Sequence, residues 1–84
     1  MGKLDGKVAI VTGAGRGIGA ATAITYGREG AAVVVASRTP STTEEVARQI
    51  RDEGGTALGI ACDVGHKEQI FAMVEQAVAA FGPI

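Results

Sequence analysis

Short continuous apolar runs alternate with longer segments of helical spacing along this chain. The runs at residues 8–11 and 32–36 are rich in β-branched side chains, and residues 56–62 form a weaker run because Gly59 interrupts it. Continuous runs of this length are typical of strands that are buried on both faces of a parallel sheet. The pattern therefore predicts three such strands.

Segments whose apolar residues have helical spacing lie between these runs and after the last one. Residues 18–29 contain several alanines and no proline, and Gly30 provides a stop directly after them. A second helix is predicted to open at Ser41, with Glu44 at capping-box spacing, and to end at Gly54. Its apolar stripe comprises Thr43, Val46, Ala47 and Ile50.

The last helix, residues 67–81, carries the most regular pattern of large apolar residues. These residues recur three, seven and ten positions after the first one and are Phe71, Val74, Val78 and Phe81. We expect this stripe to face the sheet, and Gly82 to end the helix.

The predicted element order is β-α-β-α-β-α, which is typical of an α/β fold with a parallel sheet and right-handed crossovers. Doubly wound sheets of the Rossmann type order these strands 3-2-1 and place a fourth strand beside the first. No fourth strand is predicted, and residues 8–11 lack the charges that protect an edge. We therefore expect residues 1–84 to be the incomplete N-terminal part of a dinucleotide-binding domain, unless something else covers that edge.

Composition narrows the class of protein further. The 84 residues carry a formal net charge of −1, which argues against partners such as nucleic acid or an anionic membrane. A single cysteine, Cys62, excludes an intrachain disulfide and fits a reducing compartment. No signal peptide is recognisable, and the longest uncharged apolar run is too short to span a bilayer. We expect a soluble cytoplasmic protein.

The first predicted strand and helix are joined by a glycine-rich segment, residues 12–19. A helix N-terminus offers unpaired amides and partial positive charge, and glycines let the backbone approach a pyrophosphate closely. The spacing G-x-x-x-G-x-G lacks the Lys-Ser/Thr pair of nucleoside-triphosphate loops. We interpret the segment as a dinucleotide loop, and the alternative is a plain chain reversal.

The end of the second predicted strand indicates which dinucleotide is bound. NAD(H) sites place a carboxylate there for the ribose hydroxyls, whereas this chain has Ser37 and Arg38. A guanidinium can bind a 2′-phosphate bidentately, and Arg16 could supply a second positive charge. We therefore predict that NADP(H) is favoured over NAD(H), and the alternative is that both arginines are solvated surface residues.

Four further residues carry possible chemistry. Asp63 follows the third strand, where it can accept a hydrogen bond from an adenine amino group or else cap the loop and the last helix. Cys62 is interpreted as a small buried residue and His66 as an exposed residue that forms no metal site. Tyr26 has Gly30 rather than a lysine four positions later, and is interpreted as a helix packing residue.

These motifs together resemble the start of a short-chain dehydrogenase/reductase, and within that family the NADP-dependent 3-oxoacyl-acyl-carrier-protein reductases. The resemblance implies that Gly13, Gly17 and Gly19 form the dinucleotide loop. It also implies that Gly15, Arg16 and Ile18 line the phosphates, that Ser37 and Arg38 discriminate the 2′-phosphate, and that Asp63 and Val64 flank the adenine. Complete family members are expected to be homo-oligomers that act on a carbonyl or alcohol substrate.

The family's catalytic Ser and Tyr-x-x-x-Lys pair have no counterpart in residues 1–84. Carbonyl reduction needs a proton donor, so no catalytic residue is expected in this chain. One hypothesis is that the chain is the cofactor-binding segment of an NADP-dependent oxidoreductase. The other is a free-standing dinucleotide-binding module without catalysis, or one completed by a partner chain.

Overall fold

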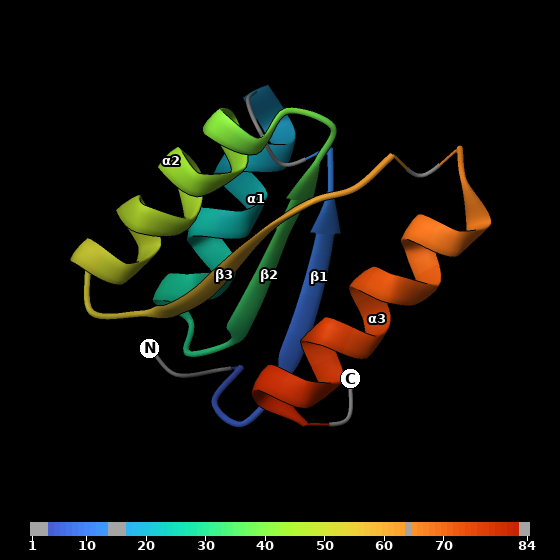
Figure 1. Ribbon diagram of the computed structural model, residues 1–84. Coiled ribbons are helices and arrows are strands. Elements are labelled where there is room, and N and C mark those ends of the chain that lie inside the picture. The colour runs from blue at the N-terminus through green and yellow to red at the C-terminus, as the bar shows by residue number, and fades with distance from the viewer. Residues whose placement is uncertain (1–3, 14–16, 64, 83–84) are drawn as a thin grey trace.

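The computed structural model describes residues 4–13, 17–63 and 65–82, which form three strands and three helices in strict alternation (Figure 1). The elements in chain order are β1 (Val8–Thr12), α1 (Gly17–Arg28), β2 (Ala32–Ser37), α2 (Pro40–Asp52), β3 (Thr56–Ala61) and α3 (Lys67–Phe81). The predicted β-α-β-α-β-α order is confirmed. Among the described residues, no helix combines the length and apolar character needed to cross a membrane.

The three strands form one parallel sheet with β2 in the centre. The order is β1-β2-β3, with Ile10 opposite Val34 and Val34 opposite Leu58 in register. This is the 3-2-1 order predicted for the opening part of a doubly wound sheet. The outer side of β1 has no strand partner among the described residues.

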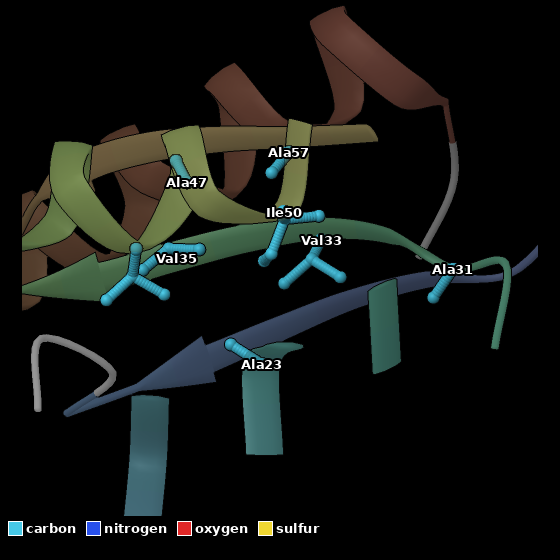
Figure 2. Close-up of a cluster of buried hydrophobic side chains, with 8 residues drawn as sticks. Ala23, Ala31, Val33, Val35, Ala47, Ile50 and Ala57 are labelled. Carbon is cyan, nitrogen blue, oxygen red and sulfur yellow. The ribbon is translucent and has the colours of Figure 1, made fainter. Parts of the chain in front are cut away.

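Alternate residues of β2 supply two separate hydrophobic cores, because successive side chains of a strand point to opposite faces. Val33 and Val35 pack with α1 and α2, and Figure 2 shows Ile50 of α2 pointing toward Val33. Val34 and Ala36 pack on the other face with Met73 and other residues of α3. The fold therefore has three layers, with α1 and α2 on one side and α3 on the other (Figure 1).

The start of α2 differs from the prediction. The helix begins at Pro40, and its N-cap residue Thr39 forms no side-chain cap bond, so the predicted capping box of Ser41 and Glu44 is wrong. Proline is favoured at the first helical position because its fixed φ suits the helix and no amide hydrogen is left unpaired. The helix therefore starts earlier than the Ser41 hydroxyl would require.

The buried face of α3 differs in part from the prediction. Met73 and Ala77 are buried, whereas Phe71 is 66% exposed and Val78 is 44% exposed. Val74 and Phe81 of the predicted stripe are half-buried, and Phe81 packs against this core. One residue step turns a helix by about 100°, so a stripe shifted by one position faces another direction. Ala77 is fully buried in the core between α3 and the sheet, and a count of large residues alone overlooks it.

Burial of β1 was also overestimated. Val8, Ala9, Ile10 and Val11 are half-buried rather than buried, because this strand lies at the edge of the sheet. The central strand β2 fits the expectation for a strand covered on both faces, since Val33, Val34 and Val35 are fully buried.

Candidate functional site

The carboxyl ends of the three strands lie at one edge of the sheet. In the sheet register Thr12 of β1 is opposite Ala36, and Ser37 of β2 is opposite Ala61 of β3. Because the strands are parallel, the segments that follow them all leave from this edge, at the top of Figure 1. In open α/β sheets ligands bind in the crevice outside this edge.

The glycine segment between β1 and α1 is described at both of its ends. Gly13 has φ +63° and Gly17 has φ +64°, both in the left-handed region that side chains disfavour. A Cβ at either position would meet no atom within 4 Å, so the backbone conformation, rather than lack of room, calls for glycine. Gly15 and Arg16 lie outside the described residues.

Helix α1 begins at Gly17 and directs its N-terminus toward the same edge (Figure 1). Its first turn contains no acidic residue, so no carboxylate there opposes an anion. Gly19 is half-buried, whereas Ile18 is 88% exposed. The backbone and charge of this helix start are therefore suited to a phosphate group.

Ser37 and Arg38 lie directly after β2, at the same edge. Arg38 is exposed, and it forms no ion pair with any residue that the structure describes. The hydroxyl of Ser37 donates to the carbonyl oxygen of Thr39 at 3.2 Å and accepts from the Thr39 amide at 3.3 Å. The guanidinium is thus free to bind an anion, while the serine hydroxyl is bonded within its own turn.

Asp63 follows β3 and organises the segment that leads to α3. Its Oδ1 accepts a hydrogen bond from the Gly65 amide at 2.9 Å, and its carbonyl oxygen accepts one from the His66 amide at 3.0 Å. Its own amide donates to Oε1 of Gln69 at 2.8 Å. These bonds agree with the interpretation of Asp63 as a residue that caps this loop. Its contact with adenine stays a prediction. Val64 lies outside the described residues.

The predicted burial of Cys62 and exposure of His66 are confirmed. Cys62 is only 3% exposed and packs in the core beneath α3, and His66 is exposed at the N-cap position of that helix. Tyr26 is 37% exposed and belongs to neither hydrophobic core, so its interpretation as a packing residue stays a prediction.

The sequence did not reveal the part that Thr43 plays near this edge. Its position in the apolar stripe was predicted correctly, since it is 2% exposed. Its hydroxyl, however, donates to the carbonyl oxygen of Pro40 at 2.7 Å, within the turn that follows Arg38. A threonine in an otherwise apolar stripe, three positions after a proline, is the signal that suggests such a bond.

Comparison with known proteins places this arrangement in a family. A family model described as short chain dehydrogenase matches residues 7–84. An uncharacterized oxidoreductase of Mycobacterium tuberculosis is 48% identical over 84 residues, which are 100% of this chain and 32% of that protein. The chain therefore spans about a third of the length of that relative.

Solved structures agree with this finding. A 7α-hydroxysteroid dehydrogenase complexed with NADH and 7-oxo glycochenodeoxycholic acid superposes with a TM-score of 0.94 at 38% identity, covering 96% of this chain and 32% of its own. A metagenomic short-chain oxidoreductase in complex with NADP gives 0.87 at 46% identity, covering 94% of this chain and 36% of its own. Both nicotinamide dinucleotides thus occur among proteins similar to this chain.

Proposed function

Because this chain belongs to the short chain dehydrogenase family, we propose that residues 1–84 form the dinucleotide-binding part of an oxidoreductase. Its reaction is hydride transfer between a nicotinamide cofactor and a carbonyl or alcohol substrate. Among family members, its motifs most resemble the NADP-dependent 3-oxoacyl-acyl-carrier-protein reductases. Its single buried cysteine suits the reducing conditions of the cytoplasm.

The proposed site uses the carboxyl edge of the sheet. The amides at the start of α1, together with Gly13, Gly15, Arg16, Gly17, Ile18 and Gly19, bind the pyrophosphate. Asp63 and Val64 flank the adenine. The described part of this edge fits such a ligand, because Gly13 and Gly17 are exposed and no acidic residue lies in the first turn of α1.

The proposed preference for NADP(H) depends chiefly on one observation, the exposed guanidinium of Arg38, which forms no ion pair within the described part of the chain. It follows β2 directly, where NAD-binding sites carry a carboxylate for the ribose hydroxyls. A guanidinium forms strong bidentate bonds to phosphate, and a neutral serine beside it does not repel the 2′-phosphate. The proposal therefore assigns discrimination between the two cofactors to Arg38.

The bound cofactor supplies the hydride, and the protein must supply orientation and a proton donor. Tyr26 is the single tyrosine of residues 1–84, and Gly30 rather than lysine lies four positions after it. We therefore propose that these residues bind the cofactor and that carbonyl reduction needs groups from outside them. Assays of residues 1–84 with NADPH and simple ketones should show no turnover above background.

Calorimetric titration with NADPH and NADH tests the cofactor proposal. Arg38→Ala should weaken NADPH binding about tenfold, since charge-assisted bonds to the 2′-phosphate are lost, and should leave NADH binding unchanged. Arg48→Ala is the matched control, because Arg48 is also an exposed arginine and lies in the middle of α2. Equal affinity for NADH and NADPH, or an unchanged preference in Arg38→Ala, would overturn the proposal.

The alternative function is that of a dinucleotide-binding module without catalysis, either free-standing or completed by a partner chain. The exposed Phe71 of α3 is an apolar feature suited to being covered by a partner, whereas the edge of β1, which has no strand partner among the described residues, favours the first proposal. A soluble monomer of residues 1–84 that unfolds cooperatively in calorimetry would support this alternative.

A further inference from the structure

The turn that carries Arg38 is held from its N-terminal side by the hydroxyl of Ser37. That hydroxyl bonds to both the amide and the carbonyl oxygen of Thr39, at 3.3 and 3.2 Å. Since Arg38 lies between these two residues, its backbone is enclosed by the pair of hydrogen bonds. The segment following Arg38 is restrained as well, because Thr39 precedes Pro40 and is extended, with φ −106° and ψ 109°.

From its C-terminal side the turn is held by Thr43. The Thr43 amide donates to the Thr39 carbonyl oxygen at 3.2 Å, and the Thr43 hydroxyl donates to the Pro40 carbonyl oxygen at 2.7 Å. Thr43 is 2% exposed and its bond to the exposed Pro40 is part-buried, so the loss of its hydroxyl leaves the donor side of this bond with little access to water. Thr42 adds an exposed bond from its hydroxyl to the Thr39 carbonyl oxygen at 3.0 Å.

The position of Thr43 is in turn fixed against β3. A Cβ on Gly59 would lie 3.2 Å from the Thr43 carbonyl oxygen and 3.3 Å from its carbonyl carbon. The absence of that Cβ allows the first turn of α2 to lie close against the strand. Thr43 therefore cannot shift without disturbing the core, and its hydroxyl connects the core to the turn at Pro40.

We propose that Thr43 is a positioning residue for Arg38: by holding the Pro40 carbonyl it fixes the turn that presents the guanidinium, and so sets the preference for the 2′-phosphorylated dinucleotide. This inference rests on the proposed function. An arginine on a fixed turn loses less conformational entropy when it binds a phosphate than one on a mobile turn. A buried threonine that never touches the cofactor thus contributes to its selection.

The test compares the ratio of the NADH and NADPH dissociation constants in variants of the full chain. Thr43→Val removes the hydroxyl and keeps a β-branched side chain, and it should lower the ratio about threefold, as the loss of one hydrogen bond implies. Thr43→Ser keeps the hydroxyl and should retain the wild-type ratio. In an Arg38→Ala background, Thr43→Val should change the ratio no further, because the group that it positions is gone.

Thr25→Val is the matched control, since the Thr25 hydroxyl forms the same kind of bond within α1, to Ala21 at 2.9 Å. If the ratio falls no more in Thr43→Val than in Thr25→Val, the inference is overturned and the proposed function stays intact. The inference is also overturned if Thr43→Val lowers the ratio equally in the wild-type chain and in the Arg38→Ala background. A wild-type chain without NADPH preference would overturn both.

Circular dichroism shows whether Thr43→Val folds. If it does not fold, Thr42→Val provides a second variant. Thr42 is only half-buried, so its replacement loosens the same turn with little effect on the core. The ratio should fall in the same direction, by about twofold, the effect of a weaker exposed bond. An unchanged ratio in this variant would count against the inference.

Discussion

Gly13 and Gly17 hold the two ends of the glycine segment in left-handed backbone conformations, with φ +63° and +64°. An L-residue pays about 1–2 kcal/mol in this region, because its Cβ approaches the carbonyl oxygen of its own peptide unit. Both positions have open space where a Cβ would lie. The requirement for glycine is thus conformational, and it makes the two residues sensitive to any substitution.

Gly17→Ala is expected to lower the free energy of unfolding by about 1–2 kcal/mol and to weaken NADPH binding, since it alters the start of α1. Gly54→Ala is the control, because Gly54 has φ +89° and equal space but lies after α2, at the opposite end of that helix from the site. Urea unfolding and calorimetry would measure both effects. If Gly54→Ala weakened binding as much, the loss would reflect stability rather than the loop.

At the residue scale, sequence predicts groups that point to solvent better than bonds that form within turns. The exposed Arg38 was predicted from its place after the second strand. The bonds of Thr43 to Pro40 and of Asp63 to Gly65 depend on where the backbone turns, which side-chain type alone does not determine. The residue type of Asp63 alone therefore does not distinguish the loop cap from the adenine contact.

Among the elements, the helices show where periodicity succeeds and where it fails. The stripe of α2 was predicted correctly because its polar residues leave a single apolar face. Helix α3 contains two sets of apolar residues with helical spacing. One set lies in or against the core and comprises Ile70, Met73 and Ala77, and the other includes the exposed Phe71 and Val78. The set with Met73 and Ala77 is the one buried in the core with β2, and helical spacing alone does not distinguish the two sets. Residue size alone therefore misplaces the stripe.

The C-terminal ends of α1 and α2 are joined by a bidentate ion pair. Nε of Arg28 lies 2.7 Å from Oε1 of Glu53, and its Nη2 lies 3.1 Å from Oε2. The hydrogen bond from Arg28 holds the pKa of the Glu53 carboxyl below its usual value. The same bond raises the pKa of Arg28, which is charged at any pH of interest.

The lowered pKa of Glu53 predicts a pH-dependent contribution to stability. The ion pair stabilises the fold above the unfolded pKa of a glutamate, about 4.3, and this stabilisation is lost as the pH falls through the lower folded pKa. Glu53→Gln should therefore be slightly less stable than wild type at pH 7 and equal to it at pH 2–3. Urea unfolding at both pH values would measure this difference, which should also shrink in 1 M salt because the pair is exposed. A difference that persisted at low pH would exclude the ion pair as its cause.

For the whole molecule, alternation of strands and helices predicted the three layers and the strand order, because parallel strands with right-handed crossovers allow few topologies. Apolar character could not indicate how much of β1 is covered. The residues of β1 are as apolar as those of β2, yet β1 has one strand neighbour among the described residues and is half-buried. Burial depends on neighbours that a local pattern does not contain.

The exposed face of α3 gives a prediction about the chain in solution. Phe71 is 66% exposed, so Phe71→Glu should change the free energy of unfolding by less than about 0.5 kcal/mol and should reduce self-association, which sedimentation velocity would measure. Met73 is 3% exposed, so Met73→Glu should unfold the chain by burying an unpaired charge. If instead Phe71→Glu unfolded the chain and Met73→Glu did not, α3 would face the sheet with the stripe of Phe71 and Val78. The two substitutions lie two residues apart on one helix, so their contrast reports which side of α3 contacts the sheet.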